Sequence, residues 1–214
     1  MANFNLFGYT DSEIKNSGFE IVAKVWLEDN PNATEQDKDK FVQKFFKGYQ
    51  NRPTQKTGNP SKTISDPLVS KLVAIKTGNK DDEKEIEKIH RASMASENLI
   101  GTLLEEYIAV NSIDKGWANC WGTTIKATDF VSDKGDRLQI KNKTNTENSS
   151  SNKIREGTNI EVWHRFDANN GKTYWAQLNE KIGKGSTLSE DGFIKFAEEA
   201  MKNNPEMLNL GKNY

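Results

Sequence analysis

The residues with the clearest chemical potential lie on either side of a predicted tight turn. Asp129 belongs to the segment ATDFV, the turn is SDKGD, and the chain returns through RLQIKNK. Because side chains alternate between the two faces of a strand, Gln139 and Lys141 project from one face, while Leu138 and Ile140 face the core. The turn places Asp129 opposite this pair on the neighbouring strand. We therefore expect a carboxylate, an amide and an ammonium group side by side.

These three groups suit metal-assisted hydrolysis of a phosphodiester. Carboxylate and amide oxygens bind a hard cation such as Mg²⁺, which keeps several waters and binds a substrate phosphate. Lys141 would orient or deprotonate the attacking water and stabilise charge on the phosphoryl oxygens. The alternative is an exposed strand pair whose outer face is simply polar, since any half-solvated strand shows the same alternation.

The elements that must position these residues are predicted from hydrophobic periodicity. Helices are expected from Asp11, capped by Asp11 or Ser12, to the stretch DNPN; from a Thr34 cap to Tyr49; and over residues 66–76, 81–110 and 187–203. Strands are expected in CWGTTIKATDFV, RLQIKNK, NIEVWHRF and KTYWAQL. The order of elements predicts an α/β fold, with an antiparallel or mixed central sheet flanked by helices and a helical N-terminal extension.

Composition narrows the class of protein only loosely. The 214 residues fit one domain, or one domain with a helical extension, and a net charge of −1 gives no global signature of a nucleic-acid or membrane binder. The single cysteine, Cys120, excludes an internal disulfide framework, and we expect it to be a small buried residue. The start of the chain lacks a signal-peptide pattern and no apolar run is long enough to span a membrane, so we expect a full-length cytoplasmic protein.

The site residues also carry a resemblance to a known family. Asp129 followed by Gln139-Ile140-Lys141, after the helical phrase SENLIGTLLEEYIA, resembles the PD-(D/E)XK nuclease core in a variant form, in which glutamine replaces the second acid. Its best carriers are type II restriction endonucleases. The longer phrase QIKNKTNTENSSSNKIREGTNIEVWHRF is similar to the corresponding stretch of the SinI-like enzymes, which recognise the short duplex sequence GGWCC. The resemblance covers roughly Ser96 to Trp175, and the first 95 residues contribute nothing to it.

Two positions depart from the family pattern. Thr128 stands where the named motif has proline, and Gln139 is a weaker metal ligand than glutamate. A helix carboxylate would compensate for that weakness. Glu97 is the first candidate because it shares a helix face with Ile100 and Leu104, and Glu105 is the second. A solvated helix residue is the equally weighted alternative for Glu97.

The resemblance implies a Mg²⁺-dependent type II restriction endonuclease that cuts double-stranded DNA. In it, Asp129 binds the metal, Gln139 helps to place it, Lys141 orients the water, and Glu97 completes the site. A palindromic target requires two active sites and therefore a homodimer, and family logic implies a cognate DNA methyltransferase. We expect residues 80–214 to form the catalytic core and residues 1–79 a helical region that embraces the DNA or dimerises.

The polar stretch from Asn142 to Thr158 is the expected DNA contact, with a flexible surface loop as the alternative. Its side chains are of the kinds that grip phosphates and read base edges. The candidates are Lys143, Asn145, Asn148, Ser149, Ser150, Ser151 and Arg155. The resemblance alone adds His164 or Arg165, whereas Asp133 and Asp136 are predicted to be turn residues. The tryptophans are expected mostly in the core.

Two other functions stay open at this point. The first is a repair or junction nuclease with the same fold, which would cut only branched or damaged DNA. The second is a non-catalytic DNA-binding or protein-interaction module on a decayed nuclease core. Its main support is Gln139, which stands where an acid is expected.

Overall fold

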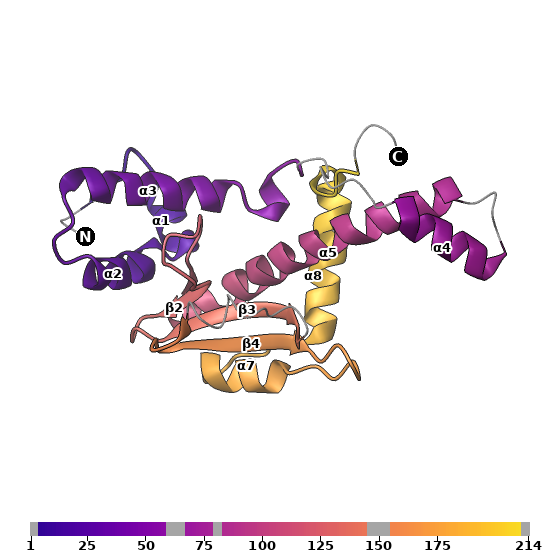
Figure 1. Ribbon diagram of the computed structural model, residues 1–214. Coiled ribbons are helices and arrows are strands. Elements are labelled where there is room, and N and C mark those ends of the chain that lie inside the picture. The colour runs from indigo at the N-terminus through magenta and orange to yellow at the C-terminus, as the bar shows by residue number, and fades with distance from the viewer. Residues whose placement is uncertain (1–3, 59–66, 79–82, 145–154, 211–214) are drawn as a thin grey trace. The chain divides into compact units, whose positions relative to one another are not determined.

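The computed structural model describes residues 4–58, 67–78, 83–144 and 155–210 (Figure 1). The chain forms two compact units. The first comprises residues 1–52 and 104–196, and the second comprises residues 53–103 and 197–214. None of the helices within the described ranges is long and apolar enough to cross a membrane.

A four-stranded mixed sheet forms the centre of the first unit. Its strands are β1 (Trp117–Asn119), β2 (Phe130–Ser132), β3 (Arg137–Lys143) and β4 (Ile160–Phe166), in that order across the sheet. The pairs β1·β2 and β2·β3 are antiparallel, and β4 runs parallel to β3. The predicted fold class, a mixed sheet flanked by helices with a helical N-terminal part, is therefore confirmed.

The N-terminal helices are α1 (Asp11–Ser17), α2 (Phe19–Asp29) and α3 (Glu35–Gln50). The predicted cap at Thr34 is confirmed, because its side chain accepts from Asp37 N–H in a capping box. The predicted single first helix is wrong: its cap is Thr10, and Gly18, with a φ of 75°, ends α1 and begins α2. A Cβ at Gly18 would lie 2.5 Å from the Ala118 side chain, so the break also allows close packing against β1.

Two aromatic clusters build the core of the first unit. One joins the N-terminal helices, where the Phe19 ring lies 5.3 Å from Phe45 and 5.2 Å from Phe46. The other lies where the end of α5 (Glu83–Ser112) meets β4, α7 (Trp175–Ile182) and α8 (Glu190–Asn203). It contains Tyr107, Trp163, Trp175, Phe193 and Phe196. These tryptophans pack in the core, as predicted.

The N-terminal helices are fastened to the sheet by polar contacts as well. Lys24 Nζ of α2 donates to Asp133 O in the turn between β2 and β3 at 2.9 Å, and Arg137 at the start of β3 pairs with Asp29. Trp121 Nε1, after β1, donates to Ser17 O at 3.2 Å. Residues 1–52 are thus an integral part of the unit that contains the sheet.

Two strand predictions are wrong. The segment KTYWAQL enters helix α7, because Trp175, Leu178 and Ile182 recur at helical spacing and are all buried. Only Thr173 keeps a strand-like bridge, to Phe166. In CWGTTIKATDFV, only the last residues enter β2; the preceding part turns through Gly122, Thr123 and Ala127, all with positive φ. Alternation of polar and apolar residues did not reveal these turns.

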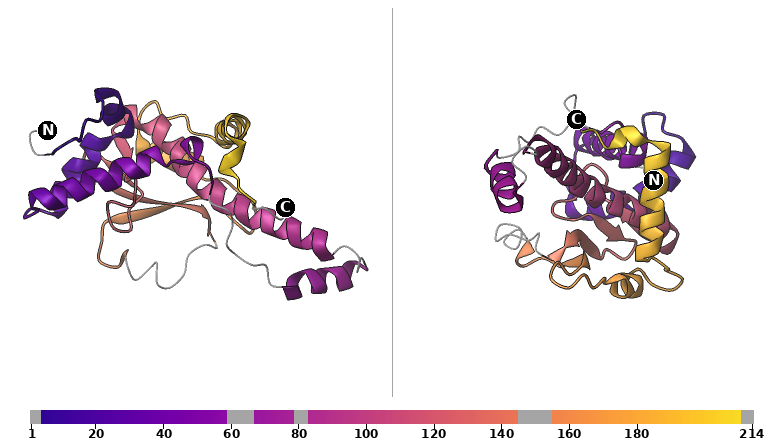
Figure 2. Two further views of the ribbon diagram at one scale, coloured as in Figure 1. Left: turned by 90° about the horizontal axis from the view of Figure 1, so that it is seen from above. Right: turned by 90° about the vertical axis from the view of Figure 1, so that its right-hand side faces the viewer.

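The second unit contains η1 (Pro53–Gln55), α4 (Pro67–Thr77), the first turns of α5, the end of α8 and η5 (Pro205–Met207). Two chain segments are joined within it, because Asn204 Nδ2 donates to Lys56 O at 2.9 Å and Gly58 N–H donates to Glu206 O at 2.8 Å. Figure 2 shows α4 and the first turns of α5 at the same end of this unit.

Gly48→Ala tests the close approach of α3 to the loop after β1. A Cβ at Gly48 would lie 2.2 Å from the backbone nitrogen of Gly122, so we expect destabilisation by about 1–3 kcal/mol. The melting temperature measures it, since about 1 kcal/mol shifts Tm by roughly 2–4 °C in a chain of this size. Gly101→Ala is the matched control, because that helical position is open and alanine favours a helix. Equal Tm changes in the two variants would contradict the packing described.

Candidate active site

The outer face of β3 presents the amide and the ammonium group. Leu138 and Ile140 are 0% and 6% exposed, whereas the alternate residues Gln139 and Lys141 are each half-buried. The register with β4 places Val162 beside Gln139 and His164 beside Lys141 on the same face. The predicted alternation of this strand is confirmed.

Asp129, directly before β2, makes two hydrogen bonds to the main chain of β3 and one to the segment after β1. Its N–H donates to Leu138 O at 3.0 Å, and its carbonyl accepts from Cys120 N–H at 2.8 Å. Its carboxylate Oδ2 accepts from Ile140 N–H at 2.7 Å, so the acid is fixed beside the segment Gln139-Ile140-Lys141. The structure therefore brings the three predicted site residues together, two on β3 and one at the start of the neighbouring strand.

The turn residues Asp133 and Asp136 have structural contacts of their own. Ser132 Oγ donates to Asp136 Oδ2 at 2.7 Å, and Asp133 N–H donates to Gly116 O at 2.8 Å. Gly135 adopts a φ of 91° that closes the turn. These contacts agree with the prediction that both aspartates serve the turn.

Glu105 of α5 is the helix carboxylate that shares the electrostatic environment of Asp129. Its pKa is raised from 4.5 to about 8: burial is the largest cause and the negative charge of Asp129 adds to it, whereas the side chain of Asn119 and the charge of Lys141 lower the pKa. Burial also raises the pKa of Asp129, against its hydrogen bond from Ile140 and the charge of Lys141. Two acids and one lysine thus form a mutually interacting group.

Glu97 was the first helix candidate from the sequence, and it lies two turns earlier on α5, in the part that belongs to the second unit. Its side chain is exposed. The sequence did contain a signal for Glu105, because Glu105 and Glu106 interrupt the most apolar stretch of the helix. Glu106 is 2% exposed and pairs with Arg52 Nε at 3.2 Å, which leaves Glu105 as the acid beside Asp129.

Gln139 and Asn119 have partners that sequence reasoning did not foresee. Arg155 Nη1 donates to Gln139 Oε1, although these residues are 16 positions apart. The side chain of Asn119, at the end of β1 and 4% exposed, lies near Glu105 and favours its charged form. No local pattern marks either contact, since each depends on how distant segments meet.

The predicted DNA-contacting residues fall into three groups. Asn145, Asn148, Ser149, Ser150 and Ser151 lie outside the described residues. Lys143 and His164 share the face of Lys141, and the Lys143 ammonium lies 5.9 Å from the centre of the Phe166 ring. Arg165 lies on the opposite, packed face, where its guanidinium pairs with Glu190 at 2.9 Å and burial lowers its pKa.

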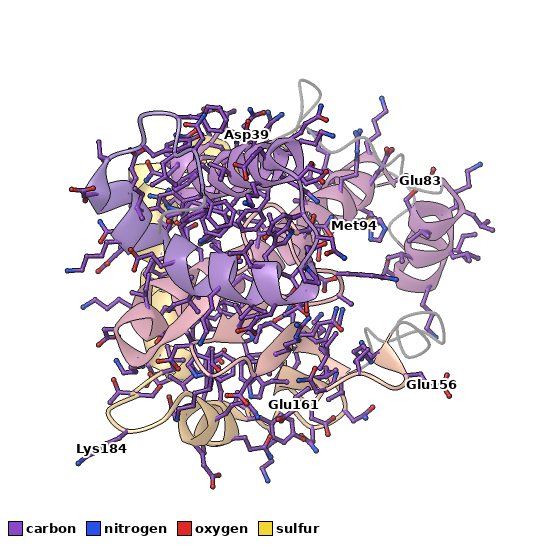
Figure 3. The ribbon with its side chains drawn as sticks, turned by 90° about the vertical axis from the view of Figure 1, so that its left-hand side faces the viewer. Asp39, Glu83, Met94, Glu156, Glu161 and Lys184 are labelled. Carbon is purple, nitrogen blue, oxygen red and sulfur yellow. The ribbon has the colours of Figure 1, made fainter. Side chains whose placement is uncertain are left out.

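Other polar features near the sheet serve packing. On β4, Glu161, which Figure 3 labels, pairs with Lys181 of α7. Burial raises the pKa of the Cys120 thiol well above its usual value, which fits the prediction of an unreactive buried cysteine.

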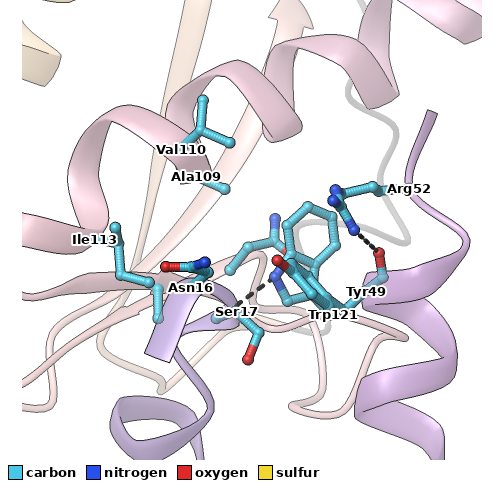
Figure 4. Close-up of a pocket in the computed structure, with 10 residues that line it drawn as sticks. Asn16, Ser17, Tyr49, Arg52, Ala109, Val110, Ile113 and Trp121 are labelled. Atoms are coloured by element: carbon cyan, nitrogen blue, oxygen red, sulfur yellow. Dashed lines mark hydrogen bonds between the residues drawn. The ribbon is translucent and has the colours of Figure 1, made fainter. Parts of the chain in front are cut away.

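A cavity of about 210 Å³ lies between α1, α3, the end of α5 and β1, with Tyr49, Arg52 and Trp121 in its wall (Figure 4).

The oxygen donors of the site are few. Among the described residues, no group of three or more histidine, cysteine, aspartate or glutamate side chains is gathered for a metal ion. The acids that interact are Asp129 and Glu105, and the amide oxygen of Gln139 lies on the adjacent strand. A hard cation would therefore depend on two carboxylates together with amide or main-chain oxygens.

A mixed sheet with an amide and a lysine on one strand and an acid directly before the neighbouring strand, beside a helix with a second acid, defines an α/β domain of the nuclease type. The chain matches the family model of the SinI restriction endonuclease over residues 17–203, and it belongs to that family. This match begins far earlier than Ser96, where the sequence resemblance started. It therefore includes the N-terminal helices α2 and α3.

Two relatives are similar over most of the chain. The type II restriction enzyme SinI of Salmonella infantis is 38% identical over 153 residues, which are 69% of this chain and 66% of that enzyme. The type II restriction enzyme Eco47I of Escherichia coli is 37% identical over 145 residues, which are 65% of this chain and 63% of the relative. The matched part thus spans slightly less than two thirds of each relative.

Glu105→Gln tests the electrostatics of the site without any substrate. Between pH 4.5 and about 8, the unfolded carboxyl group is ionised while the folded one keeps its proton, so the free energy of unfolding falls as pH rises. Removal of the acid should abolish this loss. We expect the Tm of the variant, relative to the parent, to rise by several degrees between pH 5 and pH 8 in EDTA.

Glu97→Gln is the matched control for this measurement. It removes an exposed carboxylate from the same helix and should leave the Tm difference from the parent nearly constant with pH. Parallel Tm curves for Glu105→Gln and the parent would show that Glu105 titrates normally, contrary to the arrangement described.

Proposed function

We propose that this chain is a type II restriction endonuclease of the PD-(D/E)XK kind, which hydrolyses phosphodiester bonds of double-stranded DNA at a specific sequence. The observation that carries the proposal is the placement of Asp129 beside Gln139-Ile140-Lys141, with the Asp129 carboxylate fixed by Ile140 N–H. Membership of the SinI family supports the same activity. The two relatives bear the names of type II restriction enzymes.

The site fits a divalent cation, for which we propose Mg²⁺. Burial raises the pKa of both carboxyl groups, Asp129 and Glu105. The two lie close enough together for the charge of Asp129 to raise the pKa of Glu105 as well. A bound cation favours the charged form of both acids. Asp129 and Glu105 would hold it, with Gln139 as a weaker neutral ligand. When bound, the cation supplies Lewis-acid stabilisation of the charge that develops on the phosphoryl oxygens.

The protein's own groups position and activate the water. Lys141 lies next to Asp129 and presents an ammonium group with three donors on the outer face of β3. It orients the attacking water and stabilises negative charge on the phosphate. Asp129 cannot turn away, because Oδ2 is held by Ile140 N–H at 2.7 Å. In the reaction, the water oxygen loses a proton to solvent and forms a bond to phosphorus, while the bond from phosphorus to the leaving deoxyribose oxygen breaks and that oxygen takes up a proton.

Arg155 links the chemistry to the polar stretch that we propose as the DNA contact. Its guanidinium donates to Gln139 Oε1 and so fixes the orientation of the amide. Lys143 and His164 extend the same face of the sheet away from the acids. We assign these three residues, and Asn145, Asn148, Ser149, Ser150 and Ser151, to contacts with phosphates or base edges. Arg165 is engaged with Glu190, so we assign it to packing.

The proposed target and assembly are those that the sequence resemblance implies. We propose a short palindrome of the GGWCC type, which two active sites of a homodimer would cut on both strands. A cognate methyltransferase that protects host DNA, and a cytoplasmic location, complete the proposal. Residues 80–214 supply the catalytic residues, and residues 1–79 supply helices for dimerisation or for embracing the DNA.

Lys141→Ala tests the proposed activity. We expect cleavage of a duplex that contains GGACC to fall by at least about 100-fold, because the variant loses the group that orients water and stabilises charge. Single-turnover cleavage in Mg²⁺ is the measurement. Lys184→Ala, in an exposed position after α7 (Figure 3), is the matched control and should cut at the parent rate. Unchanged cleavage by Lys141→Ala would refute the assigned role.

Gln139→Glu tests the contribution of the variant motif. A second negative charge beside Asp129 should lower the Mg²⁺ concentration needed for half-maximal cleavage by several-fold, since a carboxylate binds Mg²⁺ more strongly than an amide. Gln177→Glu on the exposed face of α7 adds the same charge elsewhere and should leave the Mg²⁺ requirement unchanged. A requirement that moves equally in both variants would show that Gln139 does not face the metal.

A further inference from the structure

Helix α4 carries an apolar stripe that faces solvent. Leu68, Leu72 and Ile75 are 56%, 58% and 65% exposed, and they follow one another at the i, i+4, i+7 spacing of a single helix face. Helices with this spacing bury the stripe against another helix. A continuous exposed stripe of this kind marks an interaction surface.

The opposite face of α4 is already packed. Ser70 and Ala74 are 7% and 0% exposed, one turn apart, so the helix is anchored through small residues. Lys71 and Lys76 are both exposed and lie on either side of the Leu68, Leu72, Ile75 stripe. The stripe is therefore an outward apolar seam with positively charged edges and no acidic residue within the helix.

The first turns of α5, in the same unit, carry the complementary surface. Ile89 is 59% exposed, and Glu85, one turn earlier, is exposed on the same side, where it lies 3.9 Å from Lys88. Six of the nine large exposed hydrophobic residues within the described ranges lie on α4 or at Ile89. An apolar stripe flanked by lysines and an apolar position with a glutamate one turn away thus occur in one unit.

We propose that these two surfaces pair between two copies of the chain: α4 of one copy packs on the Ile89 face of α5 in the other, and the reverse. Each copy offers both surfaces, so a two-fold axis satisfies both contacts at once. Pairing of α4 with α4 would oppose lysines, whereas α4 against α5 allows Lys71 to face Glu85. Nucleic acid is a poor match for the stripe, because its centre is apolar.

The proposal deepens the proposed function, on which its purpose rests, because a palindromic target needs two active sites. It also gives a specific role to residues 1–79, which contain α4. A standard interface buries roughly 800 Å² per partner, and an 11-residue helix is about 16 Å long. The seam on α4 and the reciprocal contact at Ile89 together provide the apolar centre of such an interface.

Leu72→Glu tests the seam in the whole chain. Sedimentation equilibrium should give twice the chain mass of 24.2 kDa for the parent and a dimer dissociation constant raised at least 100-fold for Leu72→Glu. Ile194→Glu is the matched control, because Ile194 is 46% exposed on α8 and should leave the dimer intact. A monomeric parent at tens of micromolar, or a Leu72→Glu variant that dimerises like the parent, would overturn the proposal.

A charge exchange tests which helices meet and does not depend on how well Leu72→Glu folds. Lys71→Glu and Glu85→Lys should each weaken the dimer several-fold, and the double variant should restore it. Purely additive weakening in the double variant would overturn the pairing of α4 with α5. DNA cleavage is measured separately from dimerisation. A dimer that responds to these variants as expected but never cuts DNA would contradict only the proposed activity. A monomer that cuts DNA would contradict only the proposed interface.

Discussion

The hydrogen bond from Ile140 N–H to the Asp129 carboxylate is the contact on which the candidate site depends. It joins the end of one strand to the middle of the next and sets the acid beside Lys141. The turn between β2 and β3 makes this register possible, and the N-terminal helices support the turn through Lys24 and Arg137. Helices far from the site in sequence thereby help to fix the position of one carboxylate.

The charges of the site explain how the carboxyl groups of Asp129 and Glu105 can both be buried there. Asp129 and Glu105 are negative when ionised, and Lys141 supplies the nearby positive charge. Burial, together with the charge of Asp129, keeps the proton on Glu105 near neutral pH. In the proposed function, such a group would exchange this proton for a divalent cation. The neutral amide of Gln139 adds an oxygen without a third negative charge.

The sequence predicted the placement of Asp129, Gln139 and Lys141 better than it predicted the helices and strands around them. The alternation in RLQIKNK and the turn residues of SDKGD are local signals, and the structure agrees with both. The helix α7 was missed because KTYWAQL is too short to separate a strand period from a helical one. Glu105 ranked behind Glu97, and the contact of Arg155 with Gln139 was not foreseen. Both depend on how distant segments pack, which spacing along one element does not encode.

The most direct test of the proposed activity is digestion of unmethylated phage DNA by the purified chain and by Asp129→Asn, in Mg²⁺ and in EDTA. The account predicts discrete fragments from the parent in Mg²⁺ only, with ends that share one short palindrome, and none from Asp129→Asn. DNA that is bound and shifted on a gel but never cut, in Mg²⁺ and with GGWCC sites present, would contradict it. So would cleavage that survives the loss of Asp129.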